Sequence, residues 1–171
     1  MLNEAVKHLK GEMDEDTFTT TIDLNVDAFI PQSYISNEYQ KLDVYKRIAA
    51  IENEEEMDDM VEELIDRFGD IPRKVQKLLH IALLKAMAHD VYVTAVEQKG
   101  EKYIFTMYEK AKVRPEKIPN VIAEYKGSLT FKADEQPCFI YHKVKRNKKE
   151  KDEDALEVVK NVLISLRGLL Q

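Results

Sequence analysis

The pattern of residues 53–72 constrains the fold of this chain more than any other stretch. Its apolar side chains recur at i, i+3, i+4, i+7, i+8 and i+11, which is the spacing of one helix face. The six are Met57, Met60, Val61, Leu64, Ile65 and Phe68. Asn53 and Glu56 form a variant of the capping box, and Gly69 supplies a residue type that ends helices. The pattern predicts a helix that ends at Gly69 and packs one side on a core, followed by another helix beginning near Pro72.

The remaining periodicities predict an α+β fold, with helices packed on a mainly antiparallel sheet in a single compact domain. Residues 19–29 alternate as a half-buried strand does. Ser36 is expected to cap a helix over residues 37–51 that turns Leu42, Tyr45, Ile48 and Ala49 inward. The helix after Pro72 is apolar around most of its circumference and is predicted to be central. Two strand pairs (91–108 and 128–144), a short helix after Pro115 and a last helix over 152–170 complete the order.

Composition excludes several classes of protein. The chain has 171 residues and five glycines, no two of which lie closer than 27 residues. A P-loop or dinucleotide fingerprint needs clustered glycines, so neither motif exists here. One cysteine, Cys138, allows no intrachain disulfide, and no apolar run approaches the ~18 residues of a membrane span. Because the first residues also lack a signal-peptide core, we expect a cytoplasmic protein with no membrane association.

The residues that could support chemistry do not form a recognisable site. The four histidines, His8, His80, His89 and His142, show no HExxH, CxxC or paired spacing. Cys138 lies in a predicted strand without an evident base, so we expect it in the core. We therefore expect no metal, no cofactor and no enzymatic activity in this chain.

Charge is concentrated in two places. Residues 52–70 hold ten acids and one base, a net charge of −9, whereas the whole chain carries only −6. A helix turns by about 100° per residue, so Asp59, Glu63 and Arg67, spaced i, i+4 and i+8, lie along one side of it, which we call the shoulder. Asp66 lies beside them. This shoulder is either solvated or an acceptor array for a basic partner. The basic stretch 143–151 is either a solvated loop or a nucleic-acid contact.

Three quoted runs resemble a known family. They are IDLNVDAFIPQSYI, YISNEYQKLDVYKRIAAI and MVEELIDRFGDIPRKVQKLL. Together they are similar to the C-terminal domain of the bacterial transcription-repair coupling factor, from about Thr20 to the end and most strongly over residues 30–84. The resemblance implies that residues 1–19 are an incoming helix or linker from the motor region. Residues 20–171 would then be the C-terminal regulatory domain.

The function follows from the resemblance as an expectation. The full-length family protein is an ATP-driven DNA translocase that contacts RNA polymerase, DNA and UvrA. Its C-terminal domain clamps on a UvrB-like module of the same protein and masks the UvrA-binding surface until stalled polymerase is engaged. Position by position, the partner-binding residues carried over are Glu63, Asp66 and Arg67, and Asp59 shares their shoulder. The alternative is a standalone interaction domain that docks an unrelated protein or nucleic acid through the acidic helix or residues 143–151.

Overall fold

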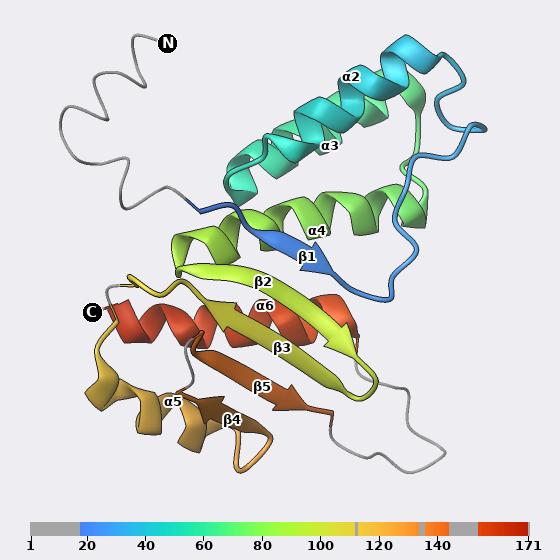
Figure 1. Cartoon of the computed structure of the whole chain (residues 1–171). Helices are drawn as coiled ribbons and strands as arrows, with labels where there is room; N and C mark the ends of the chain where they lie inside the picture. Colours follow the sequence, from blue (N-terminus) through green and yellow to red (C-terminus); the bar gives the residue numbers. More distant parts are fainter. Residues whose placement is uncertain (1–17, 112, 134–135, 144–153, 171) are drawn as a thin grey trace, which may run out of the picture.

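The computed structural model describes residues 18–111, 113–133, 136–143 and 154–170. Within these ranges it contains five α-helices and a five-stranded sheet (Figure 1). The helices are α2 (Glu38–Ala49), α3 (Glu54–Phe68), α4 (Arg73–Asp90), α5 (Ile118–Glu124) and α6 (Ala155–Leu166). The strands are β1 (Thr21–Asp23), β2 (Val93–Lys99), β3 (Lys102–Met107), β4 (Leu129–Lys132) and β5 (Cys138–His142). Two 3-10 helices, η2 (Pro115–Lys117) and η3 (Arg167–Leu170), precede α5 and follow α6.

The sheet has the strand order β1-β2-β3-β5-β4. β1 pairs with β2 in parallel, and the other three pairings are antiparallel. The mainly antiparallel α+β fold predicted from the sequence is therefore confirmed. No helix in the described ranges is long and apolar enough to cross a bilayer.

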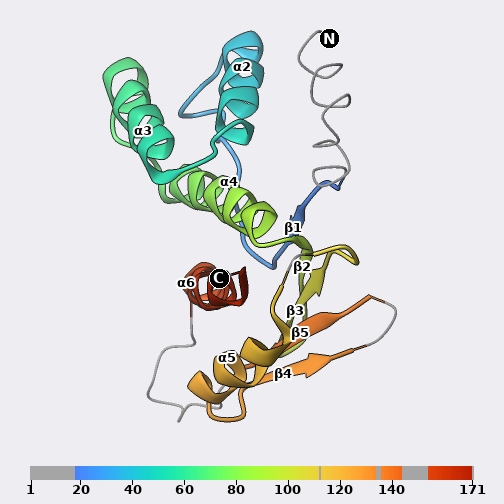
Figure 2. The same cartoon turned by 90° about the vertical axis from the view of Figure 1, so that its left-hand side faces the viewer.

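The helices cover one face of the sheet. Figure 2 shows α4, α5 and α6 on the same side of the strands. Along β3, Tyr103, Phe105 and Met107 are buried while Ile104 and Thr106 between them are only half-buried. This period of two is what a strand with one covered face requires. The main core lies between that face and helices α4 and α6.

A second hydrophobic cluster lies away from the sheet, among α2, α3 and the first half of α4. It contains Val44 and Ile48 of α2, Met60 and Leu64 of α3, and Val75 of α4 among its buried residues. Because α4 contributes side chains to both clusters, it joins the helical part to the sheet. The prediction that the helix after Pro72 is the central one is therefore confirmed.

Several local predictions were wrong in detail. Asn37 caps α2 in place of Ser36, and its side chain accepts a hydrogen bond from the Gln40 amide at 3.0 Å. Pro72 is the cap of α4 rather than a residue of its first turn. The strand predicted over 19–29 pairs only from Thr21 to Asp23, although half-buried and exposed residues continue to alternate up to Ala28. Beyond Asp23 the side chains still alternate between half-buried and exposed, but the described backbone there forms no strand pairing.

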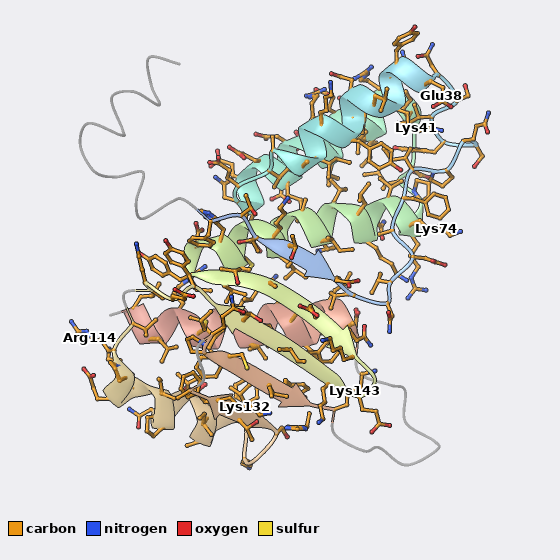
Figure 3. All side chains as sticks on the ribbon, viewed as in Figure 1. Glu38, Lys41, Lys74, Arg114, Lys132 and Lys143 are labelled. Atoms are coloured by element: carbon orange, nitrogen blue, oxygen red, sulfur yellow. The ribbon has the colours of Figure 1, made fainter. Side chains whose placement is uncertain are left out.

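The inward face predicted for α2 was also partly wrong. Leu42 is 57% exposed and Ala49 is exposed, whereas Val44 and Ile48 are buried. The helix rotates so that Val44 and Ile48, spaced i and i+4, face the helical cluster. Glu38 and Lys41, labelled in Figure 3, form an ion pair of 3.5 Å at its first turn.

Candidate functional site

The acidic helix α3 is fixed at its N-terminus by its own sequence. The Asn53 side chain accepts a hydrogen bond of 2.8 Å from the Glu56 amide. In return the Glu56 carboxylate accepts one of 2.8 Å from the Glu52 amide, one residue earlier than an ordinary capping box reaches. The first turn carries three glutamates, where the helix dipole favours anions. The start of the helix is therefore determined locally.

The C-terminus of α3 ends at Gly69, and Tyr34, which is far from it in sequence, holds that end in place. Gly69 adopts φ 88° and its amide donates to the Ile65 carbonyl at 3.0 Å. The Tyr34 hydroxyl lies 3.0 Å from the Gly69 carbonyl and 3.2 Å from the Leu64 carbonyl, both of which accept from it. Burial, and secondarily the Asp70 carboxylate, raises the pKa of Tyr34. The hydroxyl therefore remains a donor over the whole neutral range.

The four residues predicted to bind a partner lie on one ridge of α3. We call Asp59, Glu63, Asp66 and Arg67 the α3 ridge. Glu63 lies at its centre and accepts two hydrogen bonds from Arg47 of α2, that from Nη2 to Oε1 being 2.6 Å long. Arg67 Nη1 lies 3.3 Å from Glu63 Oε2, the i, i+4 pair expected from the sequence. Chiefly because of the Arg47 hydrogen bond, the pKa of Glu63 is lowered and that of Arg47 is raised.

The other ridge residues remain available on the surface. Asp59 and Asp66 are exposed, and neither carboxylate has an ion pair or hydrogen bond with another described residue. Asp59 also lines a hollow of about 370 Å³ between α2 and α3, together with Arg47 and Glu63. The Arg67 guanidinium lies 4.9 Å from the centre of the Phe68 ring and its side chain is 38% exposed. The ridge thus offers two carboxylates and one oriented guanidinium.

This arrangement is suited to recognition of a charged surface. Carboxylates and a guanidinium on a rigid helix form directional, charge-assisted hydrogen bonds with complementary groups. In the described part of the chain, no group of three or more His, Cys, Asp or Glu side chains is placed to hold a metal ion.

Sequence reasoning missed Arg47. The link between α2 and α3 is only four residues long, which indicates that the two helices are antiparallel neighbours. It does not indicate which side chains meet, because that depends on the crossing of the helices. Arg47 changes the interpretation of Glu63, because this carboxylate is already paired within the domain.

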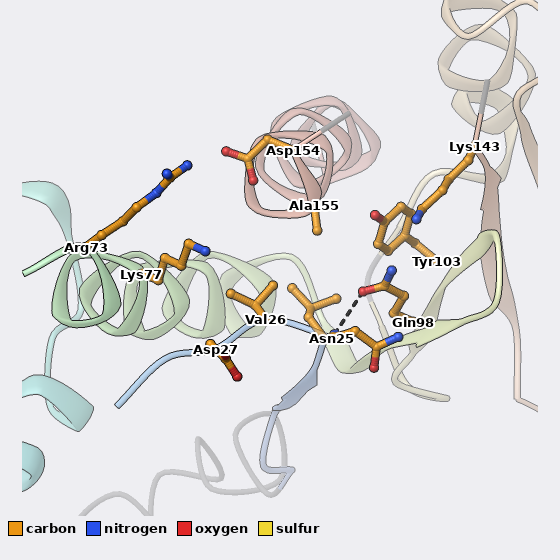
Figure 4. Close-up of a pocket in the computed structure, with 11 residues that line it drawn as sticks. Asn25, Val26, Asp27, Arg73, Lys77, Gln98, Tyr103, Lys143, Asp154 and Ala155 are labelled. Atoms are coloured by element: carbon orange, nitrogen blue, oxygen red, sulfur yellow. Dashed lines mark hydrogen bonds between the residues drawn. The ribbon is translucent and has the colours of Figure 1, made fainter. Parts of the chain in front are cut away.

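The predicted basic stretch 143–151 lies outside the described residues except for Lys143. Lys143 and two of the basic residues of α4, Arg73 and Lys77, line a hollow of about 880 Å³ (Figure 4). Two carboxylates, Asp27 and Asp154, line the same hollow, so its charges are nearly balanced.

Comparisons with known proteins give one consistent answer. The family model described as TRCF domain matches residues 24–118, a range that includes all of α2, α3 and α4. A transcription-repair-coupling factor of Staphylococcus haemolyticus is 38% identical over 113 residues, covering 65% of this chain and 10% of that protein. One of Bacillus subtilis is 37% identical over 112 residues, covering 65% of this chain and 10% of that protein. The chain therefore spans about a tenth of the length of the curated relatives it matches.

A solved structure extends the similarity beyond the matched sequence. It is the crystal structure of the C-terminal domain of a transcription-repair coupling factor, and it superposes with a TM-score of 0.69 at 26% identity. The match covers 90% of this chain and 92% of that one. The chain belongs to the TRCF domain family and has the fold of the C-terminal domain of transcription-repair coupling factor.

Proposed function

We propose that this chain is a regulatory, autoinhibitory domain of a transcription-repair coupling factor that acts in DNA repair in the bacterial cytoplasm. The domain docks on a UvrB-like module of the same protein and covers the surface that would engage UvrA. Docking also restrains the ATP-driven DNA translocase until the full-length protein meets a stalled RNA polymerase. The domain itself carries out no reaction.

The observation that carries this proposal is the exposure of carboxylates that pair with no other described residue, on a helix fixed at both ends. Asp59 and Asp66 are exposed and Arg67 is oriented by Glu63. A docking surface gains affinity when its charged groups are already in place, because less side-chain entropy is lost on binding. The net charge of −9 over residues 52–70 complements a basic partner surface.

The four ridge residues have different parts in the proposed contact. Asp59 and Asp66 supply the carboxylates for basic groups of the partner. Arg67 supplies a guanidinium, and Glu63 positions it. Because Glu63 is already paired with Arg47, it contributes less new binding energy than an unpaired carboxylate would.

Calorimetric titration of the domain with the separately expressed UvrB-like module tests the proposal. The double variant Asp59→Arg/Asp66→Arg should lose affinity by roughly 30-fold or more, which is about 2 kcal/mol, the lower range for charge pairs that lose water on binding. Asp58→Arg is the matched control, because Asp58 is an exposed aspartate of the same helix outside the ridge. It should change affinity by less than about threefold, as expected of a peripheral charge.

Circular dichroism and thermal unfolding establish that each variant is folded before titration. Equal affinity of the wild-type domain and the Asp59→Arg/Asp66→Arg variant would refute the assignment of the ridge. If Asp58→Arg lost about half as much binding free energy as the ridge variant, in proportion to their charge changes of +2 and +4, only overall charge would matter, and the assignment would also be refuted.

A further inference from the structure

A second surface lies on the other flank of α3. Helices α3 and α6 flank α4 (Figure 2). A hollow of about 420 Å³ lies between α3 and α4, and one of about 450 Å³ lies between α4 and α6. The first is lined by α3 residues that include Met57, Val61 and Ile65, and the second by α6 residues that include Leu156 and Ile164. His80 of α4 lines both hollows, so the two adjoin each other along α4, and we call them together the α4 groove.

Each wall of this groove exposes a large apolar side chain. Ile65 of α3 is 45% exposed and Ile164 of α6 is 47% exposed. Single exposed apolar residues are common, but two that line adjoining hollows, each with further apolar residues in its lining, indicate a binding surface. Each wall therefore offers apolar surface that the described residues of the chain leave partly exposed.

The charged side chains that line the groove indicate which kind of partner it can bind. The carboxylates of Asp70, Asp154 and Glu157 line the groove. Lys160 also lines it, but its ammonium already pairs with Glu54 of α3 at 3.4 Å. Anionic partners such as nucleic acid or an acidic membrane surface are repelled by this excess of carboxylates. A cationic partner is attracted, and its apolar residues can cover Ile65 and Ile164.

We propose that this groove binds an amphipathic helix of a partner protein, with an apolar stripe at i, i+3, i+4 and i+7 flanked by lysine or arginine. A cleft between two helices, floored by a third, is the shape in which such a helix buries its apolar stripe. The proposal does not depend on the α3 ridge, because Ile65 and Val61 face the opposite flank of α3 from Asp59 and Asp66.

A designed peptide serves as the probe for this surface. It has about 18 residues, long enough to form a helix when bound, with leucine at the stripe positions and lysine elsewhere. A matched peptide carries glutamate in place of every lysine. Fluorescence anisotropy measures affinity, and isoleucine methyl resonances of the labelled domain report whether the peptide lies against Ile65 and Ile164.

The lysine peptide should bind and shift the methyl resonances of Ile65 and Ile164. The variant Ile65→Ser/Ile164→Ser should weaken this binding by ~10-fold or more, as expected for truncation of two central apolar contacts. Leu42→Ser is the matched control, since Leu42 is an exposed leucine on α2 outside the groove, and it should bind as wild type does. Glu157→Lys, a substitution at an exposed position, should also weaken binding of the lysine peptide.

Several results would overturn the proposal. They are absence of binding at millimolar peptide, equal binding of the glutamate peptide, equal effects of the groove variant and Leu42→Ser, or methyl shifts confined to other isoleucines. Analytical sedimentation of the domain alone tests whether a second copy of the chain occupies the groove instead. Self-association that is lost in Ile65→Ser/Ile164→Ser would assign the groove to a second copy of the chain instead.

Discussion

The ion pair between Arg47 and Glu63 yields the sharpest quantitative prediction. It joins α2 to α3 through two hydrogen bonds, with the side chains 42% and 34% exposed respectively. Exposed pairs contribute about 0.2–1 kcal/mol, because water screens the charges and both side chains lose freedom. The Arg47 guanidinium binds the Glu63 carboxylate through two hydrogen bonds, a bidentate geometry that is among the stronger ion pairs. We therefore expect a coupling energy at the upper end of that range, about 1 kcal/mol.

A double-mutant cycle measures this coupling. The variants are Arg47→Met, Glu63→Gln and the combination, each unfolded at pH 7 both with urea, for the coupling energy, and with heat. Each single variant should lower the midpoint of thermal unfolding by roughly 2–4 °C for a loss near 1 kcal/mol in a domain of this size. The double variant should lose less stability than the two single variants added together.

The coupling should depend on pH in one direction. The pKa of Glu63 in the folded domain lies below its ordinary value of 4.5, chiefly because Arg47 donates to the carboxylate. Its contribution is therefore fully present above about pH 4.5 and is lost as the pH falls through the lower, folded-state pKa. A coupling energy below about 0.3 kcal/mol at neutral pH would refute the reasoning, because it would mean that Glu63 is not engaged by Arg47 in solution.

Two further predictions concern how α3 is held. Leu64→Ala should lower the free energy of unfolding by about 2–5 kcal/mol, because Leu64 is completely buried in the helical cluster. Urea unfolding measures this loss, with the exposed Leu42→Ala as control, and a loss below that of Leu42→Ala would contradict it. Gly69→Ala should cost about 1–3 kcal/mol through backbone strain alone, since φ is 88° and an added Cβ meets no atom within 4 Å. Hydrogen exchange should then report faster opening of the last turn of α3, and unchanged exchange there would argue against the strain.

The boundaries of α3 could be predicted because local chemistry determines them. Asn53 and Glu56 satisfy the first amides of the helix, and Gly69 takes a backbone conformation that other residues resist. The apolar stripe also identified the buried side, since Met60 and Leu64 lie in the core. Its outer member Ile65 lies at the edge of the stripe, and the neighbouring helices leave it 45% exposed. Periodicity gives the direction of a face, whereas its width is decided by what packs against it.

The sequence alone determined the types of element, the α+β class and the position of the acidic shoulder, because these depend on spacing within single segments. The tertiary structure decided which segments meet. It paired β1 in parallel with β2, placed Arg47 against Glu63 and set α3 and α6 on either side of α4. Such contacts join residues far apart in the chain, and they depend on helix crossing and strand order, which no local pattern encodes.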